Sequence, residues 1–138
     1  MKFTFSLLLM MLIILPAFSQ NKPTGPVKAR VEVLYFHPND RCPIDQAIEE
    51  NSLKTVHTYF LTELKNGKLK FQVLNTDEPA NAKVVSGFDI NAQALYLVKH
   101  DKGKELKTDL TKFAFDYAKS NPGKFKSGLK EEIEKALK

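Results

Sequence analysis

Cys42 is the only cysteine in the 138-residue chain, and it lies between a cation and a nearby carboxylate. Arg41 precedes it and Asp45 follows three residues later. A strand-like run ends before this segment and a helix-like run starts near Pro43. The thiol is therefore expected at a helix N-terminus, where N–H groups and the helix dipole stabilise a thiolate. A disulfide within this segment would need a second thiol at position 45, where the chain has Asp45.

Asp45 has two opposing expected effects on the thiol. Its negative charge disfavours a neighbouring thiolate, whereas as a base it can accept the thiol proton. Two interpretations of Cys42 stay open: a single reactive thiol that forms mixed disulfides, and an idle remnant of a lost dithiol site.

His37 lies five residues before Cys42, at the expected end of the strand. It can face the thiol, as a Cys/His pair needs, or bond to its own turn, which is the commoner use of such a histidine. Asp40 and Asp45 add carboxylates, but the spacing matches no familiar metal site, so we predict no metal and no cofactor. His100 lies at a later strand end and is expected to have no companion side chain.

The elements that must position this segment follow from hydrophobic periodicity and turn residues. Runs rich in valine and aromatic residues predict strands, three-to-four spacing of apolar residues predicts helices, and Asn66-Gly67 is typical of a helix end. Asp77 is expected to cap a short helix, and residues 101–104 are typical of a hairpin turn. The predicted strands are residues 29–36, 68–74, 93–98 and 105–108, and the predicted helices are residues 43–64, 80–86, 109–120 and 125–137.

The resulting order is β-α-β-α-β-β-α with one additional helix before the last, which predicts a single α/β domain. The final helix has apolar residues at strict four-residue spacing, and we expect this stripe to lie on the sheet. Its members are Phe125, Leu129, Ile133 and Leu137.

The N-terminus has the pattern of a secretory signal peptide. After Lys2, an apolar run of about 13 residues leads to Ala17-Phe18-Ser19, which fits a small-x-small cleavage site. The run is shorter than the roughly 20 residues of a membrane span. We therefore expect export to a periplasm or secretion, with no stable span after cleavage, rather than an uncleaved anchor. The predicted organisation is a signal peptide over residues 1–19, a flexible leader over residues 20–28 and one domain over residues 29–138.

Charge and cysteine content limit the function further. The formal net charge is +5, but lysines are interspersed with acidic residues, as in residues 130–135, which indicates a solvated helix face rather than a nucleic-acid surface. A single cysteine cannot form a disulfide within one chain, so packing has to stabilise the domain. An odd exported cysteine is also compatible with a Cys42-linked dimer.

Several segments together carry a recognisable pattern. They are the strand end Tyr35-Phe36-His37, the turn Arg41-Cys42-Pro43, residues 73–79, and the short helix that closes on Gly87-Phe88-Asp89-Ile90. Over residues 29–138 this pattern resembles the thioredoxin-like superfamily. With Glu49-Glu50-Asn51 added, it is similar to small exported bacterial proteins labelled as the thioredoxin-like subunit of a nitrophenyl-compound nitroreductase. The resemblance implies an α/β, thioredoxin-like fold with a central four-stranded mixed sheet flanked by helices.

Two departures from the family pattern argue against dithiol chemistry. The family's second cysteine is Asp45 here, and its cis-proline opposite the thiol corresponds to Ala94, or to Gln93 if the register shifts by one. The resemblance therefore implies a degenerate Cys-x-x-Asp site. Its candidate catalytic residues are Cys42, Asp45, Arg41 and His37, and its active-site face adds Pro43, Gln93 and Ala94.

Two functional hypotheses follow from different classes. In the first, favoured by Asp45 and the missing proline, an exported non-dithiol binding or accessory protein holds an unknown protein partner with the old active-site face. In the second, Cys42 acts as a monothiol in exchange with a small thiol or a partner protein. Neither hypothesis includes nucleic acid, a metal or another cofactor.

Overall fold

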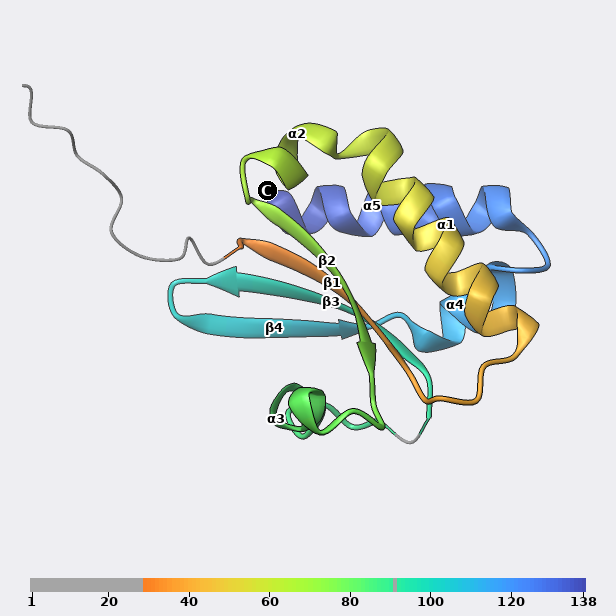
Figure 1. Ribbon diagram of the computed structural model, residues 1–138. Coiled ribbons are helices and arrows are strands. Elements are labelled where there is room, and N and C mark those ends of the chain that lie inside the picture. Colours follow the sequence, from red (N-terminus) through yellow and green to blue (C-terminus); the bar gives the residue numbers. More distant parts are fainter. Residues whose placement is uncertain (1–28, 91) are drawn as a thin grey trace, which may run out of the picture.

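The computed structural model describes residues 29–90 and 92–138, which form a mixed α/β arrangement of strands and helices (Figure 1). The predicted signal peptide and leader, residues 1–28, lie outside the described residues. In chain order the elements are β1(Val31–His37), α1(Pro43–Tyr59), α2(Leu61–Lys65), β2(Leu69–Asn75), the 3-10 helix η1(Pro79–Asn81), α3(Ala82–Val85), β3(Ala94–Asp101), β4(Lys104–Asp109), α4(Thr111–Tyr117) and α5(Pro122–Leu137).

The four strands form one mixed sheet in the order β2-β1-β3-β4. Strand β1 is parallel to β2 and antiparallel to β3, so Val31 is paired with Leu69 on one side and with Lys99 on the other. The predicted hairpin at residues 101–104 is confirmed: β3 and β4 are antiparallel. Its two central residues, Lys102 and Gly103, have φ of 48° and 80°. Such left-handed values at both positions match the twist of the flanking strands.

Helices α1, α4 and α5 cover one face of the sheet, which we call the helix face (Figure 1). The predicted stripe on the last helix lies here, because Phe125, Leu129 and Ile133 are fully buried, and Leu137 packs against the same cluster. Alternate residues of β1 supply the sheet side of this core: Val31, Val33 and Tyr35, all at 0% exposure. This packing fixes the start of α1 relative to the ends of the strands.

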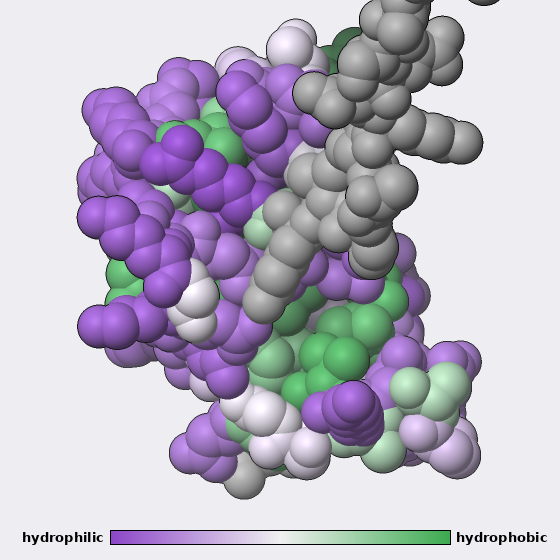
Figure 2. Space-filling view, turned by 90° about the vertical axis from the view of Figure 1, so that its left-hand side faces the viewer, coloured by the Kyte–Doolittle hydropathy of each residue, from purple (hydrophilic) through white to green (hydrophobic). Residues whose placement is uncertain are grey.

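The opposite face of the sheet, here called the open face, carries a smaller apolar cluster covered by the chain around α3 (Figure 1). The Phe88 ring lies 5.0 Å from Phe36 and 4.9 Å from Tyr96, measured between ring centroids. Beside this cluster is a groove of about 570 Å³ whose lining includes Leu34, Val98, Phe88 and several lysines. Figure 2 shows apolar surface gathered just above the lowest part of the molecule, where α3 lies, on an otherwise mainly hydrophilic side.

The predicted helix over residues 43–64 is interrupted. Helix α1 ends at Tyr59, and Phe60, with φ of −131°, separates it from the short α2. Phe60 is 4% exposed and belongs to the helix-face core, so burial of its ring outweighs the helical preference of its neighbours. Gly67 follows α2 with φ of 76°, which agrees with the predicted helix end at Asn66-Gly67.

Two polar residues differ from their sequence predictions. Asp77 does not cap the short helix, since Glu78 stands at its N-cap; instead the Asp77 Oδ2 accepts a hydrogen bond of 2.7 Å from the Asn39 backbone N–H. His100 has companions: its Nε2 lies 3.0 Å from Glu32 Oε2, and its Nδ1 lies 3.5 Å from Glu105 Oε1. The contacts of Asp77 with Asn39 and of His100 with Glu32 join segments distant in the chain, which local patterns do not reveal. The contact of His100 with Glu105 lies across the β3–β4 hairpin, where these two residues are paired.

Candidate functional site

Cys42 is the N-cap residue of α1, and its side chain is exposed. The extended backbone of Cys42, with φ of −97° and ψ of 168°, leads directly into Pro43 at the first helical position. Proline is well suited to that position because its fixed φ fits a helix and its missing N–H would have no partner there. The sequence prediction that the thiol lies at the start of a long helix is therefore confirmed.

Asp45 lies beneath the thiol and braces the loop. Its Oδ2 accepts a hydrogen bond of 2.8 Å from the Cys42 backbone N–H and one of 3.0 Å from Nε2 of Gln93. The first contact is half of a capping box, in which an N3 acid satisfies the N-cap N–H. The second contact connects the start of α1 with the residue before β3. The side chain of Asp45 is 0% exposed, so this brace is internal.

The pKa of Asp45 lies below its ordinary value. Burial by itself raises this pKa and is the largest single influence, but hydrogen bonds from Cys42 and from the Gln93 amide, with the positive charge of Arg41, lower it and outweigh burial. Asp45 is therefore an ionised carboxylate at neutral pH, stabilised by donors that are fixed in place. The role of this carboxylate is therefore structural, since it accepts the hydrogen bonds that hold the loop.

Tyr35 and the Arg41–Glu49 pair extend this polar cluster. Arg41 Nη2 is in contact with Glu49 Oε2, and both side chains are partly buried. Burial raises the pKa of Tyr35 strongly, the charge of Asp45 raises it further, and the charge of Arg41 lowers it. Among the described residues, three buried atoms here have no hydrogen-bond partner: the Tyr35 hydroxyl, Arg41 Nε and Asp45 Oδ1. The thiol thus lies above a compact set of opposed charges and one neutral phenol.

Of the remaining candidate residues, Pro43 and Gln93 lie at the Cys42 loop, whereas the side chains of His37 and Ala94 contact other parts of the molecule. Pro43 is exposed beside Cys42, and Gln93 is half-buried with its amide on Asp45, so both belong to the loop region. His37 contacts its own turn, with Nδ1 2.8 Å from the Pro38 carbonyl oxygen, and its ring lies 5.8 Å from that of Tyr35. Ala94 is 4% exposed and packs in the apolar cluster of the open face, so its side chain adds nothing to an accessible surface.

Two members of this cluster were missed from the sequence. Tyr35 looked like an ordinary aromatic of a buried strand, and Glu49 looked like one acid of an exposed helix start. The available signal was parity along β1: residues 31, 33 and 35 share the face on which α1 lies. A hydroxyl at the last of these positions falls under the start of that helix.

No three His, Cys, Asp or Glu side chains within residues 29–90 and 92–138 are grouped so that they could hold a metal ion. In the same part of the chain, every helix is too short or too polar to cross a membrane. No family model, curated protein or solved structure matches this chain. A function for the site therefore has to be argued from the side chains described above.

Proposed function

We propose that this chain is an exported, thioredoxin-like binding or accessory protein that holds a partner with the face around Cys42, without dithiol chemistry. The observation that carries the proposal is the complete burial of Asp45, whose Oδ2 bonds to both Cys42 and Gln93. The carboxylate occupies the place of a second thiol and holds the loop in one shape. A surface fixed before binding loses little conformational entropy when a partner docks.

A groove beside the loop supports this proposal. It has a volume of about 270 Å³ and is lined by Arg41, Gln46, Glu49, Glu50 and Leu53. Leu53 is 42% exposed, so an apolar contact point lies among charged and polar side chains. An apolar centre with a polar rim is the usual composition of a protein-binding surface. The partner class proposed is therefore a protein that presents an apolar residue to Leu53.

The test is retention of proteins from the exported fraction of the source cells on the immobilised chain lacking residues 1–19. Wild type and Cys42→Ser should retain the same protein, because the proposed contact needs no thiol, whereas Leu53→Asp should lose it. Leu61→Asp is the matched control, since Leu61 is 45% exposed on the neighbouring helix α2. Equal retention by all four baits would contradict the proposed face.

One observation favours the alternative function, monothiol exchange: Cys42 is exposed at the N-cap of α1. In that reaction the Cys42 thiolate attacks one sulfur of a small disulfide, a mixed disulfide forms, and the other half leaves as a thiolate that takes up a proton. Under the binding proposal, oxidised glutathione should modify Cys42 no faster than it modifies an unstructured cysteine peptide. A rate at least about tenfold higher, measured by mass increase and absent in Cys42→Ser, would favour the alternative.

Asp45→Cys tests the thioredoxin-like geometry of the loop. If residue 45 holds the position of the family's second cysteine, mild oxidation of this variant should form a reversible disulfide with Cys42. The measurement is the number of thiols per chain before and after oxidation. An unchanged thiol count would contradict the assigned position.

Export is tested separately, because the predicted signal peptide lies outside the described residues. Expression of the full chain in a bacterial host should give a protein in the exported fraction that starts at Gln20, as determined from its intact mass. A product that retains Met1 in the membrane fraction would support the uncleaved anchor instead.

A further inference from the structure

The groove on the open face has an apolar floor and charged sides. Its volume of about 570 Å³ falls within the roughly 300–1,000 Å³ that is usual for small-molecule sites. Leu34 and Val98 line it from the sheet, and Val84 and Phe88 line it from the chain around α3. Val84 is 41% exposed, so packing within the chain leaves much of this side chain in water. The groove therefore offers apolar surface that a ligand can cover.

One row of side chains runs across the sheet at this groove. Lys70 is paired with Glu32, Glu32 with Val98, and Val98 with Lys107. Paired residues of neighbouring strands direct their side chains to the same face, and all four of these residues line the groove. Neighbouring strands are about 4.8 Å apart, so the backbones of Lys70 and Lys107 are about 14 Å apart. A lysine therefore stands at each edge of the sheet.

The two glutamates of the lining are engaged within the chain. Glu32 Oε2 lies 3.0 Å from Nε2 of His100, and Glu105 Oε1 lies 3.5 Å from Nδ1 of the same ring. His100 lies beyond Val98 toward the β3–β4 turn, whereas α3 covers the other end of this face. Both carboxylates are therefore held at the end of the groove away from α3.

The three lysines of the lining differ in their contacts. Lys107 Nζ donates to the Gly87 carbonyl at 2.6 Å and lies 4.3 Å from the centroid of the Phe88 ring, so Lys107 is part of the wall. Lys70 on β2 and Lys83 on α3 are exposed. Within residues 29–90 and 92–138, neither of their ammonium groups has a hydrogen-bond or ion-pair partner. Lys70 and Lys83 can therefore pair with an anion without giving up a contact.

We propose that this groove binds a small amphipathic carboxylate, a molecule with an apolar tail and one negative head group. The tail lies on Leu34, Val98 and Phe88, and the carboxylate lies at Lys70 and Lys83. Burial of the tail supplies most of the affinity, and the two lysines select a negative head group over a neutral or positive one. This site is independent of the proposed binding face around Cys42.

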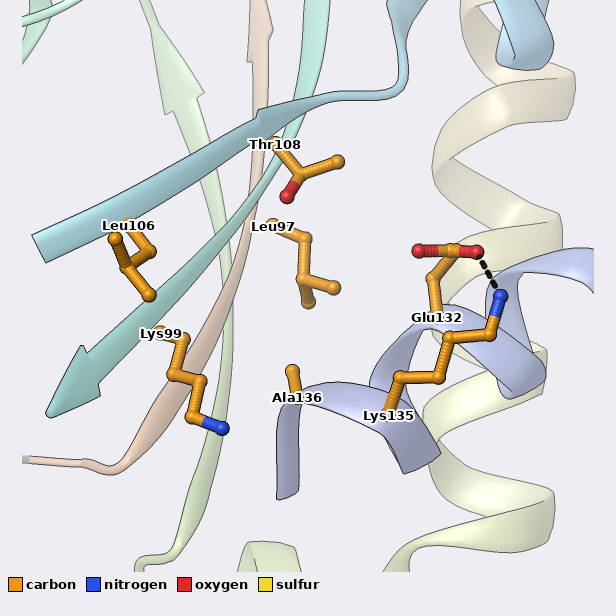
Figure 3. Close-up of a pocket in the computed structure, with 7 residues that line it drawn as sticks. All are labelled: Leu97, Lys99, Leu106, Thr108, Glu132, Lys135 and Ala136. Atoms are coloured by element: carbon orange, nitrogen blue, oxygen red, sulfur yellow. Dashed lines mark hydrogen bonds and ion pairs between the residues drawn. The ribbon is translucent and has the colours of Figure 1, made fainter. Parts of the chain in front are cut away.

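A second groove that borders β4, on the helix face, lacks this combination. It lies between the β3–β4 hairpin and α5 (Figure 3), and its volume of about 190 Å³ is below the roughly 300 Å³ at which ligand sites begin. Leu97, Leu106 and Ala136 supply apolar walls, but Glu132 stands on the helix side, 2.7 Å from Lys135. The amphiphile is therefore expected on the open face.

Three ligands with the same tail test the choice of head group. Octanoate, octan-1-ol and octylammonium carry a negative, a neutral and a positive head group at pH 7. Amide chemical shifts of the isotope-labelled chain lacking residues 1–19 should give a dissociation constant below about 5 mM for octanoate. Octan-1-ol should bind at least about fivefold more weakly, and octylammonium more weakly still. Shifts should be centred on Leu34, Val98 and Phe88, and Ala136 should not respond.

Paired substitutions test the two lysines. Lys70→Gln combined with Lys83→Gln should weaken octanoate binding to the level of octan-1-ol, while octan-1-ol binding stays unchanged and shows that the groove is intact. Lys65→Gln combined with Lys119→Gln is the matched control, since both are exposed lysines outside the groove and the change in net charge is the same. This control should keep the preference for octanoate.

Val84→Asp tests the apolar wall at an exposed position, where the fold should tolerate the change. The new carboxylate should weaken octanoate at least about fivefold, because it removes apolar surface and adds a like charge near the head group.

Four outcomes would overturn the proposal. They are no saturable shift with octanoate, equal affinity for all three ligands, a preference for octanoate that survives loss of Lys70 and Lys83, and shifts centred on Ala136.

Discussion

The two faces of the sheet share strand β1 but are covered very differently. On the helix face, Val31, Val33 and Tyr35 of β1 lie under α1 and α5 and are fully buried. On the open face, Leu34 and Phe36 belong to a smaller cluster whose cover is Val85, Phe88 and Ile90, around the four-residue helix α3. The groove on this side is also the larger of the two that border β4.

This difference in burial indicates that the helix face contributes more to the stability of the fold than the open face does. The helix face also holds the start of α1, so the Cys42 loop is attached to the larger of the two apolar cores. We expect substitutions on the open face to cost less stability than substitutions on the helix face. The four predictions that follow test this difference by the loss of unfolding free energy that each substitution causes.

Phe125→Ala should have the largest effect. The side chain is 0% exposed, and its ring stacks on Phe113 at 5.5 Å with an interplanar angle of 17°. Truncation of a fully buried phenylalanine leaves a cavity and costs about 4 kcal/mol of unfolding free energy. Urea denaturation measures the loss; a value below about 1 kcal/mol would mean that α5 does not carry the core.

Phe88→Ala is the counterpart on the open face. Phe88 is only partly buried, although its ring contacts Phe36 and Tyr96, and Lys107 Nζ lies 4.3 Å from its centroid. We expect a loss of about 2 kcal/mol, half of that at Phe125, because less area leaves water and the short α3 can adjust. Equal losses at the two positions in the same denaturation experiment would remove the distinction between the faces.

Gly128→Ala tests how closely the helices of the helix face pack. A Cβ at Gly128 would lie 2.5 Å from Cζ of Phe113, so that ring would have to move. Crowding of about 2 kcal/mol, partly offset by the better helix propensity of alanine, should leave a net loss of about 1.5 kcal/mol. Gly123→Ala on the same helix is the control, since its nearest atom would be Asn121 Oδ1 at 3.7 Å and no loss is expected.

Asp45→Asn should have the smallest effect, and the effect should depend on pH. Asp45 has a lowered pKa in the folded chain: burial opposes ionisation, but the hydrogen bonds from Cys42 and Gln93 and the charge of Arg41 outweigh it. A lowered folded-state pKa stabilises the fold above the unfolded pKa, and this contribution is lost as the pH falls through the folded value. Asparagine should therefore cost about 1 kcal/mol at pH 7 and progressively less below about pH 4.

Urea denaturation of wild type and Asp45→Asn across this pH range makes the comparison. Asp40→Asn removes a carboxylate from an exposed site in the same loop and is the matched control for the loss of one negative charge. A difference between wild type and Asp45→Asn that is constant with pH would show that shape, and not charge, holds the brace.

Much of the fold was predictable because its signals are local. The Lys102-Gly103 turn needs left-handed backbone at both positions, and the sequence provides a glycine there. The stripe from Phe125 to Ile133 has the helical period, and it is buried as predicted. The interruption at Phe60 was not predictable, because neither Tyr59 nor Phe60 is a helix breaker. The helix breaks at Phe60 because its ring is buried in the tertiary structure, and the spacing of apolar residues does not show this.

The sequence predicted which segments meet at the candidate site, but it did not predict which side chains bond to each other there. Strand order places the residue before β3 beside the start of α1, so the proximity of Gln93 to Cys42 followed from the proposed fold. The hydrogen bond from Gln93 to Asp45 and the pairing of Arg41 with Glu49 depend on side-chain directions. Ala94 shows the same limit, because the alternation of β3 directs its side chain to the open face.

The central place of β1 has a consequence for how the chain reaches this structure. Val31 pairs with both Leu69 and Lys99, so the first strand of the described residues has one neighbour that is translated much later. Helix α5, which packs against α1, comes later still. During synthesis from the N-terminus, neither the sheet nor its helix layer can close until the last third of the chain is available. The contacts that complete the sheet and its helix layer therefore form only after β3 and α5 have been synthesised.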